Sequence, residues 1–420
     1  MAKLSSSNGI EKRPKLRFPG FDEPWKETTL SALFSKSTQK NADGHITNVI
    51  CNSAKLGLIP QREYFYKDIA NSDNTSGYYI IRQNDFVYNP RKSSDAPYGP
   101  ISSYKYAEDG IVSPLYLCFH AKDEINPLYY EWYFRSSAWH RYIYMSGDSG
   151  ARHDRVSIKD DTFFAMPINL PSEQEQSKIA SFLQSLDERI AAQEKLVASL
   201  KKYKRGSLSA LFPKKGEITP QYRFAGFTKP WEQRKLGDMG STLNGLSGKT
   251  KDDFGHGEAK FITYMNVFSN PIADLTMTES IEIDKKQKSV KAGDVFFTTS
   301  SETPDEVGMS SVMPEDADNI YLNSFCFGYR PTEKFDLNYL AYVLRADSFR
   351  KEMTFLAQGI SRYNISKNKV MEVCIPVPTI EEQTKVGRYF RNLDNLITLH
   401  QHKYDTLLSL KNALLQQMFI

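Results

Sequence analysis

The sequence predicts a mixed α/β (α+β) protein in which two similar globular domains are separated by two long helices that pair as an antiparallel coiled coil. Three observations support this fold class: a motif near the start of the chain returns 206 residues later, each half alternates strand-like and helical stretches, and each half ends in a long heptad repeat. A period this long exceeds the roughly 20–50 residues of solenoid repeats. It therefore indicates duplication of a whole domain plus a helix, related by an internal pseudo-twofold.

The duplicated motif has an aromatic opening segment and a later proline–glutamine segment. The opening segment Arg17-Phe18-Pro19-Gly20-Phe21 with Pro24-Trp25 returns as Arg223-Phe224-Ala225-Gly226-Phe227 with Pro230-Trp231. The later segment, Pro171 to Gln176, returns as Pro378 to Gln383, and each copy leads into an amphipathic stretch. Two related but unequal modules in one chain suggest a protein that reads two unequal half-sites.

Each half shows strand and turn patterns followed by helical spacing. In the first half, apolar runs at 78–81, 86–88 and 115–119 are separated by turn formers, and residues 126–146 carry aromatic residues at helical spacing. The second half repeats this order with runs at 295–297 and 325–329 and a helix near 336–356. Each globular domain is therefore expected to combine helices and strands.

The two long helices carry apolar residues at a 4-3-4-3 spacing, which is the seam of a coiled coil. Polar residues interrupt both seams at matched places, because Gln193 corresponds to His400 and Lys204 to Lys411. We expect the helices to pair with each other, and pairing with a partner protein is the alternative. The predicted seam residues are Ile179, Leu183, Leu186, Ile190, Val197 and Leu200, and Val386, Phe390, Leu393, Ile397, Tyr404 and Leu407.

Each long helix is predicted to begin at a capping box that follows a proline. Ser172 with Glu175, and Thr379 with Glu382, match the S/T-x-x-E pattern, in which the glutamate side chain reaches back to the cap. The predicted segments are a flexible N-terminal segment (1–14), a first domain (15–170), a central spacer helix (171–213), a linker (214–220), a second domain (221–378) and a C-terminal spacer helix (379–420).

Composition restricts the possible classes of protein. The 54 basic and 50 acidic residues leave a net charge of +4, so any surface for nucleic acid must be local. The 4 cysteines are scattered without a C-x-x-C, which argues against a zinc site or a disulfide framework. No apolar run approaches the roughly 18–20 residues that cross a bilayer, and the first residues lack the apolar core of a secretion signal. We expect a soluble cytoplasmic protein without a membrane partner.

Motifs for nucleotide, metal or covalent chemistry are incomplete. Residues 245–250 imitate a phosphate loop, but Leu243 stands where the P-loop needs its first glycine. Residues 256–258 imitate the H-x-E of zinc deaminases, but no P-C-x-x-C follows. The chain also lacks G-x-S-x-G, H-E-x-x-H and the Rossmann fingerprint. The sequence therefore predicts no catalytic residue and no metal site.

Basic residues interleaved with polar and aromatic ones gather in loops that are suited to DNA. Arginine can grip phosphate or pair bidentately with guanine, and asparagine can pair with adenine in the same way. The last loops of the two halves align, Gly150 with Gly359 and 156–157 with 365–366. For any single loop, an ordinary solvated loop is the alternative. The candidates are Arg91, Lys92, Ser93, Tyr104, Lys105, Arg152, His153 and Arg155 in the first half, and Lys249, Thr250, Lys251, Lys260, Ser361, Arg362, Tyr363 and Asn364 in the second.

Taken together, these motifs resemble the specificity (S) subunit of type I restriction–modification enzymes. The resemblance rests on the opening segments, on the two strand-to-proline-to-Glu-Gln segments and on the heptads that follow, and it covers essentially 15–420. One departure is Asn169, where the second copy has Pro376. The resemblance implies two target-recognition domains, 15–170 and 221–378, each reading half of an asymmetric bipartite DNA site, with the helices as a ruler for the spacer.

The resemblance also implies partners that carry the chemistry. Two methyltransferase (M) subunits would hold S-adenosylmethionine and methylate DNA, usually at adenine, and two motor-nuclease (R) subunits would hold ATP and Mg²⁺. This chain would bind none of these cofactors, and its own ligand would be double-stranded DNA. The alternatives are a duplicated coiled-coil scaffold that does not read DNA sequence, and a self-contained methyltransferase or nuclease.

Overall fold

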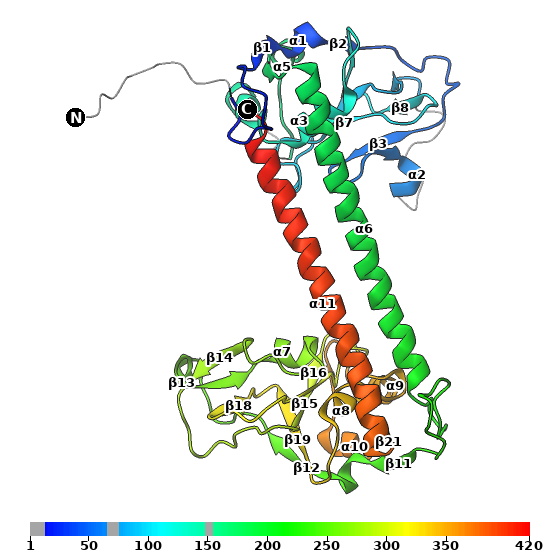
Figure 1. Cartoon of the computed structure of the whole chain (residues 1–420), viewed down its shortest axis with the longest axis vertical. Helices are drawn as coiled ribbons and strands as arrows, with labels where there is room; N and C mark the ends of the chain where they lie inside the picture. The colour runs from blue at the N-terminus through cyan, green and yellow to red at the C-terminus, as the bar shows by residue number, and fades with distance from the viewer. Residues whose placement is uncertain (1–12, 65–74, 148–153) are drawn as a thin grey trace, which may run out of the picture. The chain divides into compact units, whose positions relative to one another are not determined.

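The computed structural model describes residues 13–64, 75–147 and 154–420, so most of the predicted flexible segment lies outside the described residues. The chain divides into two compact units (Figure 1). Unit 1 comprises Met1–Ala192 with Lys403–Ile420, and unit 2 comprises Gln193–His402. Both divisions fall inside the long helices α6 (Glu173–Leu211) and α11 (Ile380–Gln417), so each unit holds one stretch of each helix.

Unit 1 is built around a four-stranded antiparallel sheet in the order β2-β9-β6-β7, with the two-stranded sheets β1-β10, β3-β4 and β5-β8 beside it. Its strands are β1 (Lys26–Thr29), β2 (Phe34–Ser37), β3 (Ile50–Ser53), β4 (Gly57–Pro60), β5 (Tyr79–Ile81), β6 (Phe86–Tyr88), β7 (Ile101–Ser103), β8 (Gly110–Val112), β9 (Leu117–Ala121) and β10 (Pro167–Leu170). Its shorter helices are α1 (Leu30–Leu33), α2 (Gln61–Tyr64), α3 (Pro127–Arg135), α4 (His140–Ser146) and α5 (Asp160–Phe164).

Unit 2 repeats this plan. Its four-stranded antiparallel sheet has the order β12-β19-β15-β17, and β14-β13-β18, β11-β21 and β16-β20 form the smaller sheets. Its strands are β11 (Glu232–Lys235), β12 (Gly240–Asn244), β13 (Phe254–Ile262), β14 (Thr278–Ile281), β15 (Val295–Thr298), β16 (Ser300–Ser301), β17 (Ser310–Val312), β18 (Ile320–Leu322), β19 (Cys326–Pro331), β20 (Tyr363–Asn364) and β21 (Cys374–Val377). Its helices are η2 (Leu236–Asp238), η3 (Lys251–Asp253), α7 (Tyr264–Ser269), α8 (Leu337–Val343), α9 (Asp347–Leu356) and α10 (Lys367–Met371).

Aromatic residues form much of the core of unit 1. The rings of Phe34, Phe86 and Phe119 come from three neighbouring strands and lie 5.3–5.6 Å apart. The helix predicted over 126–146 is interrupted, because Ser136 closes α3 by donating its N–H to Trp132 and Tyr133 and its hydroxyl to Tyr133. In unit 2 the predicted helix is likewise two, α8 and α9.

The opening segment and the start of the following long helix are held together by a buried ion pair in each unit. Arg17 donates to both carboxylate oxygens of Glu175 at 2.7 and 2.8 Å, and Arg223 does the same to Glu382 at 2.6 and 2.7 Å. The glutamates are 0% and 1% exposed, so each arginine compensates a charge that water does not reach. The opening segment and the later Glu-Gln segment are therefore joined in each half by one ion pair.

Of each predicted capping box, only the bond from the glutamate N–H to the cap side chain forms. The cap side chains behave as expected, because Ser172 accepts the N–H of Glu175 at 3.3 Å and Thr379 accepts that of Glu382 at 3.5 Å. The glutamate side chains do not return to the caps, since a charge-assisted bidentate bond to arginine is stronger than a bond to one neutral N–H.

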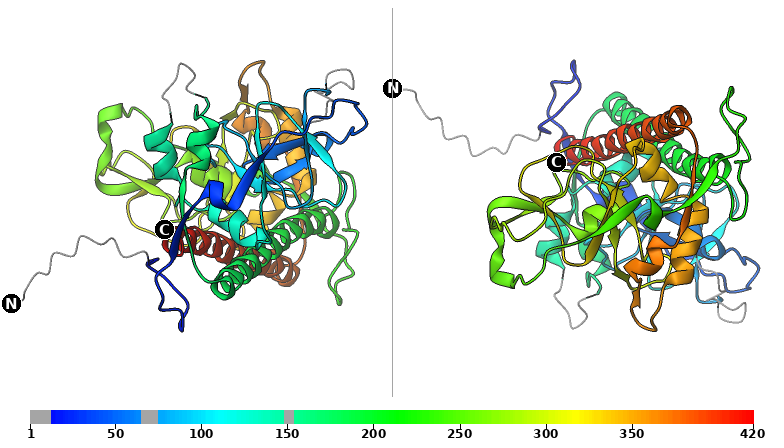
Figure 2. Two further views of the ribbon diagram at one scale, coloured as in Figure 1. Left: turned by 90° about the horizontal axis from the view of Figure 1, so that it is seen from above. Right: turned by 90° about the horizontal axis from the view of Figure 1, so that it is seen from below.

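The heptad prediction is confirmed, and α6 and α11 lie side by side and antiparallel (Figures 1 and 2). All the predicted seam residues are buried or half-buried. The polar interruptions pair across the seam: Gln193 donates to the His400 carbonyl at 2.9 Å in unit 2. Each seam lysine forms an ion pair with an aspartate on the opposite helix. Lys204 pairs with Asp394 at 2.5 Å in unit 2, and Lys411 pairs with Asp187 at 2.6 Å in unit 1.

Candidate nucleic-acid interface

In unit 1, four of the predicted DNA-binding residues meet at one end of the central strand β6. The chain beyond β6 pairs with residues 154–156: Arg91 forms a β-bridge with Arg155, the Lys92 N–H donates to the Asp154 carbonyl at 2.9 Å, and the Val156 N–H donates to the Pro90 carbonyl at 2.9 Å. Arg91, Lys92, Ser93 and Arg155 line a groove of about 800 Å³, whose other wall is the β3–β4 hairpin.

The charges in this groove favour an anionic ligand. Like charges directly opposite each other on paired strands are destabilising, and Arg91 and Arg155 occupy such positions. Among the described residues, Arg91 has no ion pair, and Arg155 has only the exposed carboxylate of Asp154 at 3.8 Å. A phosphate or an electronegative base edge between the two guanidinium groups would relieve their repulsion.

Unit 2 has the same backbone arrangement with different side chains. Strand β16, which follows β15, pairs with β20, so Ser300 lies opposite Asn364, and the Ile365 N–H donates to the Thr299 carbonyl at 3.0 Å. Ser300 and Asn364 are thus the structural counterparts of Arg91 and Arg155, which confirms that the last loops of the two halves correspond. The two units present two arginines in one case and a serine and an asparagine in the other.

At this place in unit 2 the predicted Arg362 is joined by Tyr264, Ser300 and Lys367, which the sequence did not single out. The Tyr264 hydroxyl donates to the Ser300 carbonyl at 2.7 Å, Arg362 Nε donates to Ser300 Oγ at 3.4 Å, and Lys367 Nζ donates to Asn244 Oδ1 at 3.0 Å. Burial raises the pKa of Tyr264. Serine and tyrosine are common throughout the chain, so only the pairing of β16 with β20 singles these residues out.

Two half-buried arginines bind backbone carbonyls near the segment between β16 and β17: Arg350 binds the segment itself, and Arg345 binds β17 and α7. Arg350 donates to the carbonyls of Asp305, Val307 and Gly308 at 2.6–2.9 Å, and Arg345 donates to Ser310, Val267 and Phe268 at 2.8–3.0 Å. Burial lowers the pKa of Arg345 to about 9 and that of Arg350 to about 10, so both remain charged at neutral pH. Arg350 thereby holds the loop that follows β16.

Two predicted residues of unit 1 do not belong to the groove. Tyr104 is fully buried and its hydroxyl donates to the Glu108 carbonyl at 2.8 Å, so it offers no surface to a ligand. Lys105 pairs with the buried carboxylate of Glu131 at 3.0 Å. Both residues lie beyond the Phe86–Ser103 end of the β6–β7 pair, opposite the end that carries Arg91. Arg152 and His153 lie outside the described residues.

The phosphate-loop-like segment of unit 2 is occupied by contacts within the protein. Lys249 is 13% exposed and lies 2.9 Å from Asp284 and 3.9 Å from Asp253, and the Thr250 hydroxyl donates to Asp253 at 2.9 Å. The prediction that Lys249 and Thr250 contact DNA is therefore not supported, because the nearby carboxylates neutralise the lysine and engage the threonine.

The remaining candidates of unit 2 are distributed over two surfaces. Lys251 is exposed at η3, and Lys260 is exposed on β13, opposite Ser280 of β14 in the β14-β13-β18 sheet. Ser361, Arg362, Tyr363 and Asn364 lie in or beside β20, next to β16. Only the second group occupies the place that corresponds to the groove of unit 1.

The Lys249–Asp284 pair predicts a pH effect on stability. The bonds from Lys249, the Lys286 N–H and Gln287 lower the pKa of Asp284 from 3.8 to about 2. A carboxyl whose pKa is lower in the folded state stabilises the fold above its unfolded pKa, and this contribution disappears as the pH falls through the folded value. The melting temperature of Asp284→Asn should therefore lie below that of the wild type at pH 6, and the gap should close between about pH 4 and pH 2.

The matched control for this prediction is Asp252→Asn, which removes an exposed carboxylate that has no ion pair among the described residues. It should leave the melting temperature nearly unchanged across the same range. A gap between wild type and Asp284→Asn that persists at the lowest pH would contradict the assignment.

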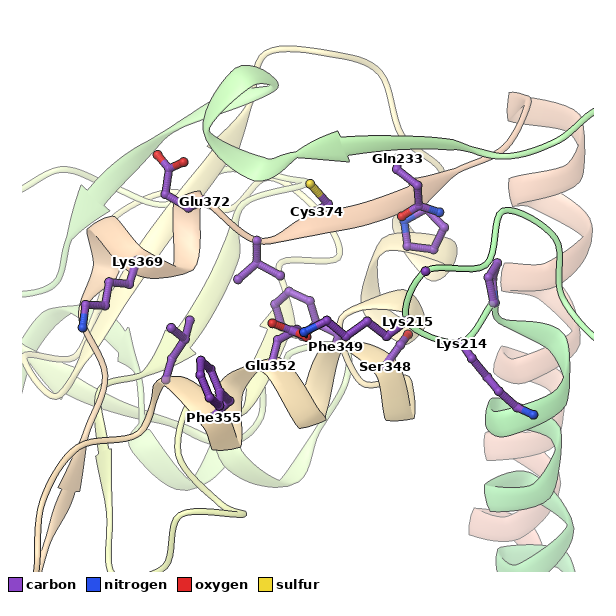
Figure 3. A pocket seen from close by; sticks show the side chains of 15 residues that line it. Lys214, Lys215, Gln233, Ser348, Phe349, Glu352, Phe355, Lys369, Glu372 and Cys374 are labelled. Atoms are coloured by element: carbon purple, nitrogen blue, oxygen red, sulfur yellow. The ribbon is translucent and has the colours of Figure 1, made fainter.

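A separate cleft of about 390 Å³ lies in unit 2 between α9, β21 and residues 213–216 (Figure 3). Lys215 forms an ion pair with Glu352 at 2.6 Å on its wall, and Phe355 and Cys374 border it. None of the predicted DNA-binding residues lines this cleft. Within residues 13–64, 75–147 and 154–420, no cluster of His, Cys, Asp or Glu suits a metal ion, and no helix has the length and apolarity to cross a membrane.

The fold and the interface define a class of protein: two divergent copies of one α+β domain, each continuing into a helix of a shared antiparallel pair, with a polar surface at the same place in each copy. Residues 27–202 and 228–409 match the family described as the type I restriction modification DNA specificity domain. These segments span most of the sequence, so the chain belongs to this family and contains its domain twice.

Two curated relatives are described as specificity subunits of the same kind. The MjaVIII type I specificity subunit of Methanocaldococcus jannaschii is 24% identical over 262 residues, which are 60% of this chain and 61% of the relative. The putative MjaX specificity subunit of the same organism is 22% identical over 276 residues, 62% of this chain and 60% of the relative. The chain thus matches about three fifths of the length of these relatives.

Two solved structures share the fold. A chain from a study of assembly and conformational transition of the type I R-M system has a TM-score of 0.60 at 16% identity, covering 95% of this chain and 98% of that one. The S subunit from M. genitalium has a TM-score of 0.54 at 14% identity, covering 97% and 99%. At these identities the likeness shows the fold alone.

Proposed function

We propose that this chain is the DNA sequence-recognition subunit of a type I restriction–modification complex. Each unit reads one half of an asymmetric bipartite site, and partner subunits methylate the DNA, usually at adenine, and restrict it. The observation that carries the proposal is the equivalence of two surfaces that differ in chemistry: Arg91 with Arg155 in unit 1, and Ser300 with Asn364 in unit 2. A scaffold that merely bound the same protein twice would have no need to vary these positions.

The expected division of labour follows from the family. Two methyltransferase subunits holding S-adenosylmethionine and two motor-nuclease subunits holding ATP and Mg²⁺ would supply the chemistry, and this chain would contribute no catalytic residue. Its DNA ligand would place it in the cytoplasm. These partners and this location are part of the proposal, since the curated relatives are matched over only part of their length.

The decisive experiment is sequencing of host DNA for modified bases in strains with and without this chain. We expect one bipartite motif with unlike halves to lose its methylation when the chain is removed. An unchanged pattern of methylation, or the loss of a palindromic motif, would contradict the proposal. Binding of the purified complex to that motif should also weaken steeply as salt is raised, which a protein scaffold would not show.

The ruler role predicts a measurable change in spacer. Four residues added in α6 beside Gln193, with four added in α11 beside His400, keep these two hydrogen-bonded residues opposite each other. Each helix gains about 6 Å, the length of nearly two base pairs. Methylation mapping should return the same half-sites with a spacer longer by one or two base pairs. The same spacer in the mapped motif would exclude the ruler.

A further inference from the structure

Ile360 is the most exposed large apolar side chain among the described residues, with 97% of its surface accessible. It lies in the loop between α9 and β20. Figure 3 shows the two ends of this connection: the chain leaves α9 beside Phe355 and returns at α10 beside Lys369. An isoleucine held almost wholly in water is unfavourable for the isolated protein, since burial of such a side chain is strongly favoured.

The backbone on both sides of Ile360 is fixed. Gln358 and Asn364 exchange backbone hydrogen bonds of 2.9 and 2.8 Å, which close the loop, and β20 pairs with β16. Gly359 has a φ of +150°, and a Cβ there would lie 2.0 Å from the Arg362 carbonyl oxygen. Only glycine fits this close approach. The loop therefore holds Ile360 outward and prevents it from folding back onto the unit.

The neighbours of Ile360 in the loop are suited to DNA. Ser361 and Arg362 follow it and are exposed, and Arg362 has no carboxylate partner among the described residues. Its positive charge lies beside Ser300 and Asn364, the counterparts of the arginine pair in unit 1. A protein-docking surface would offer a contiguous apolar patch. This loop instead offers one apolar side chain next to a cation and hydrogen-bonding groups.

We propose that Ile360 inserts between two base pairs of the half-site read by unit 2 and kinks the duplex, while Arg362 holds an adjacent phosphate. Proteins that deform DNA insert apolar side chains such as isoleucine between base steps and kink the duplex by roughly 20–90°. The sequence alignment puts Ala151 at the corresponding position of the first half, and alanine is too short to separate base pairs. The kink is therefore expected at one half-site only. This inference rests on the proposed function.

The test measures end-to-end energy transfer in a short duplex that carries the mapped bipartite site and a dye at each end. The full chain is bound together with its methyltransferase partner, and 2-aminopurine at successive steps of each half-site reports unstacking. Wild type should shorten the dye separation and brighten 2-aminopurine at one step of the unit 2 half-site. Ile360→Ala should abolish both signals and weaken binding by roughly tenfold, because the apolar contact is lost.

Two control variants make the result specific. Ile360→Leu keeps a long apolar side chain and should retain the kink, and Phe355→Ala removes a side chain that is 82% exposed at the end of α9 but outside the loop. An equal kink with wild type and Ile360→Ala would overturn the inference and leave the proposed function intact. The inference would also be overturned if Ile360→Ala kinked the DNA normally but no longer assembled with its methyltransferase partner. That result would make Ile360 a contact to protein instead of DNA. Failure of the wild-type complex to bind the duplex would overturn both.

Discussion

Replacement of Arg91 and Arg155 together by glutamine should weaken binding of the assembled complex to its DNA site by roughly a hundredfold, since each charged contact contributes about 1–3 kcal/mol. Arg91 and Arg155 stand opposite each other in a β-bridge, and among the described residues their one ion pair is that of Arg155 with Asp154 at 3.8 Å, so DNA is their expected counter-charge. The slope of log K against log salt should also fall in magnitude by about 2 if both side chains contact phosphate, because each phosphate contact contributes about 0.9. A binding titration at several salt concentrations measures both quantities.

The control removes the same amount of charge elsewhere in unit 1. Lys26 lies in β1 and Lys122 follows β9 at the end remote from Arg91, and neither lines the groove. Glutamine at both positions should leave the affinity within a fewfold of wild type. If the control pair and the arginine pair change the affinity and the salt slope equally, the groove has no special part in binding. If the arginine pair changes sequence preference without changing the salt slope, the arginines contact bases instead of phosphates.

The largest effect on stability should come from Glu382→Gln. The carboxylate of Glu382 is 1% exposed and accepts bonds from Arg223 at 2.6 and 2.7 Å and from the Trp231 indole N–H at 3.0 Å. The neutral amide leaves the Arg223 charge uncompensated, and loss of one partner of a buried ion pair costs about 3–5 kcal/mol. Urea unfolding of unit 2 should show this loss, and Trp231 fluorescence provides a probe inside the affected site.

Two comparisons separate this effect from general damage. Glu333→Gln breaks the exposed pair with Arg234 in the same unit and should lower the stability far less than Glu382→Gln, because solvent screens this pair. The double change Arg223→Met with Glu382→Met removes both charges and should be less destabilising than Glu382→Gln alone, since no unpaired charge remains. If the cost of Arg223→Met adds in full to that of the change at Glu382, the double variant will be less stable than the single one. That result would show that the two residues act independently.

The equivalent change in unit 1 offers a matched comparison within one chain. Glu175 pairs with Arg17 in the same geometry, but the buried indole N–H of Trp25 has no hydrogen-bond partner among the described residues. Glu175 therefore makes one bond fewer to its surroundings than Glu382. Loss of the Glu382 carboxylate should therefore lower the stability more than loss of the Glu175 carboxylate.

The sequence predicted the architecture because the features that determine it are periodic or repeated. The seam residues recur every three or four positions, and an apolar stripe of this kind needs a second helix to cover it. The roles of Glu175 and Glu382 could not be derived in this way. A local pattern suggested a cap, whereas the arginine that competes for each glutamate lies 158 or 159 residues away.

The candidate interface was predicted only in part, for a related reason. The basic loop residues Arg91, Lys92 and Arg155 were found by composition, and the fold brings them together. Lys249 and Tyr104 have the same composition signal, but the fold surrounds the first with carboxylates and buries the second. Ser300 and Tyr264 carry no signal in the sequence. They gain their place only because β15 continues into a strand that pairs with the last loop.

The ion pair between each opening segment and the following long helix has a consequence for how a domain of this chain could be exchanged. Arg17 precedes the strands and short helices of unit 1 and Glu175 follows them, and Arg223 and Glu382 bracket those of unit 2 in the same manner. A recombination event that replaces everything between the two charged residues leaves their ion pair intact. If each unit reads DNA as proposed, a foreign domain placed between the two charges would keep this ion pair, and one recombination event would change the sequence that the unit reads.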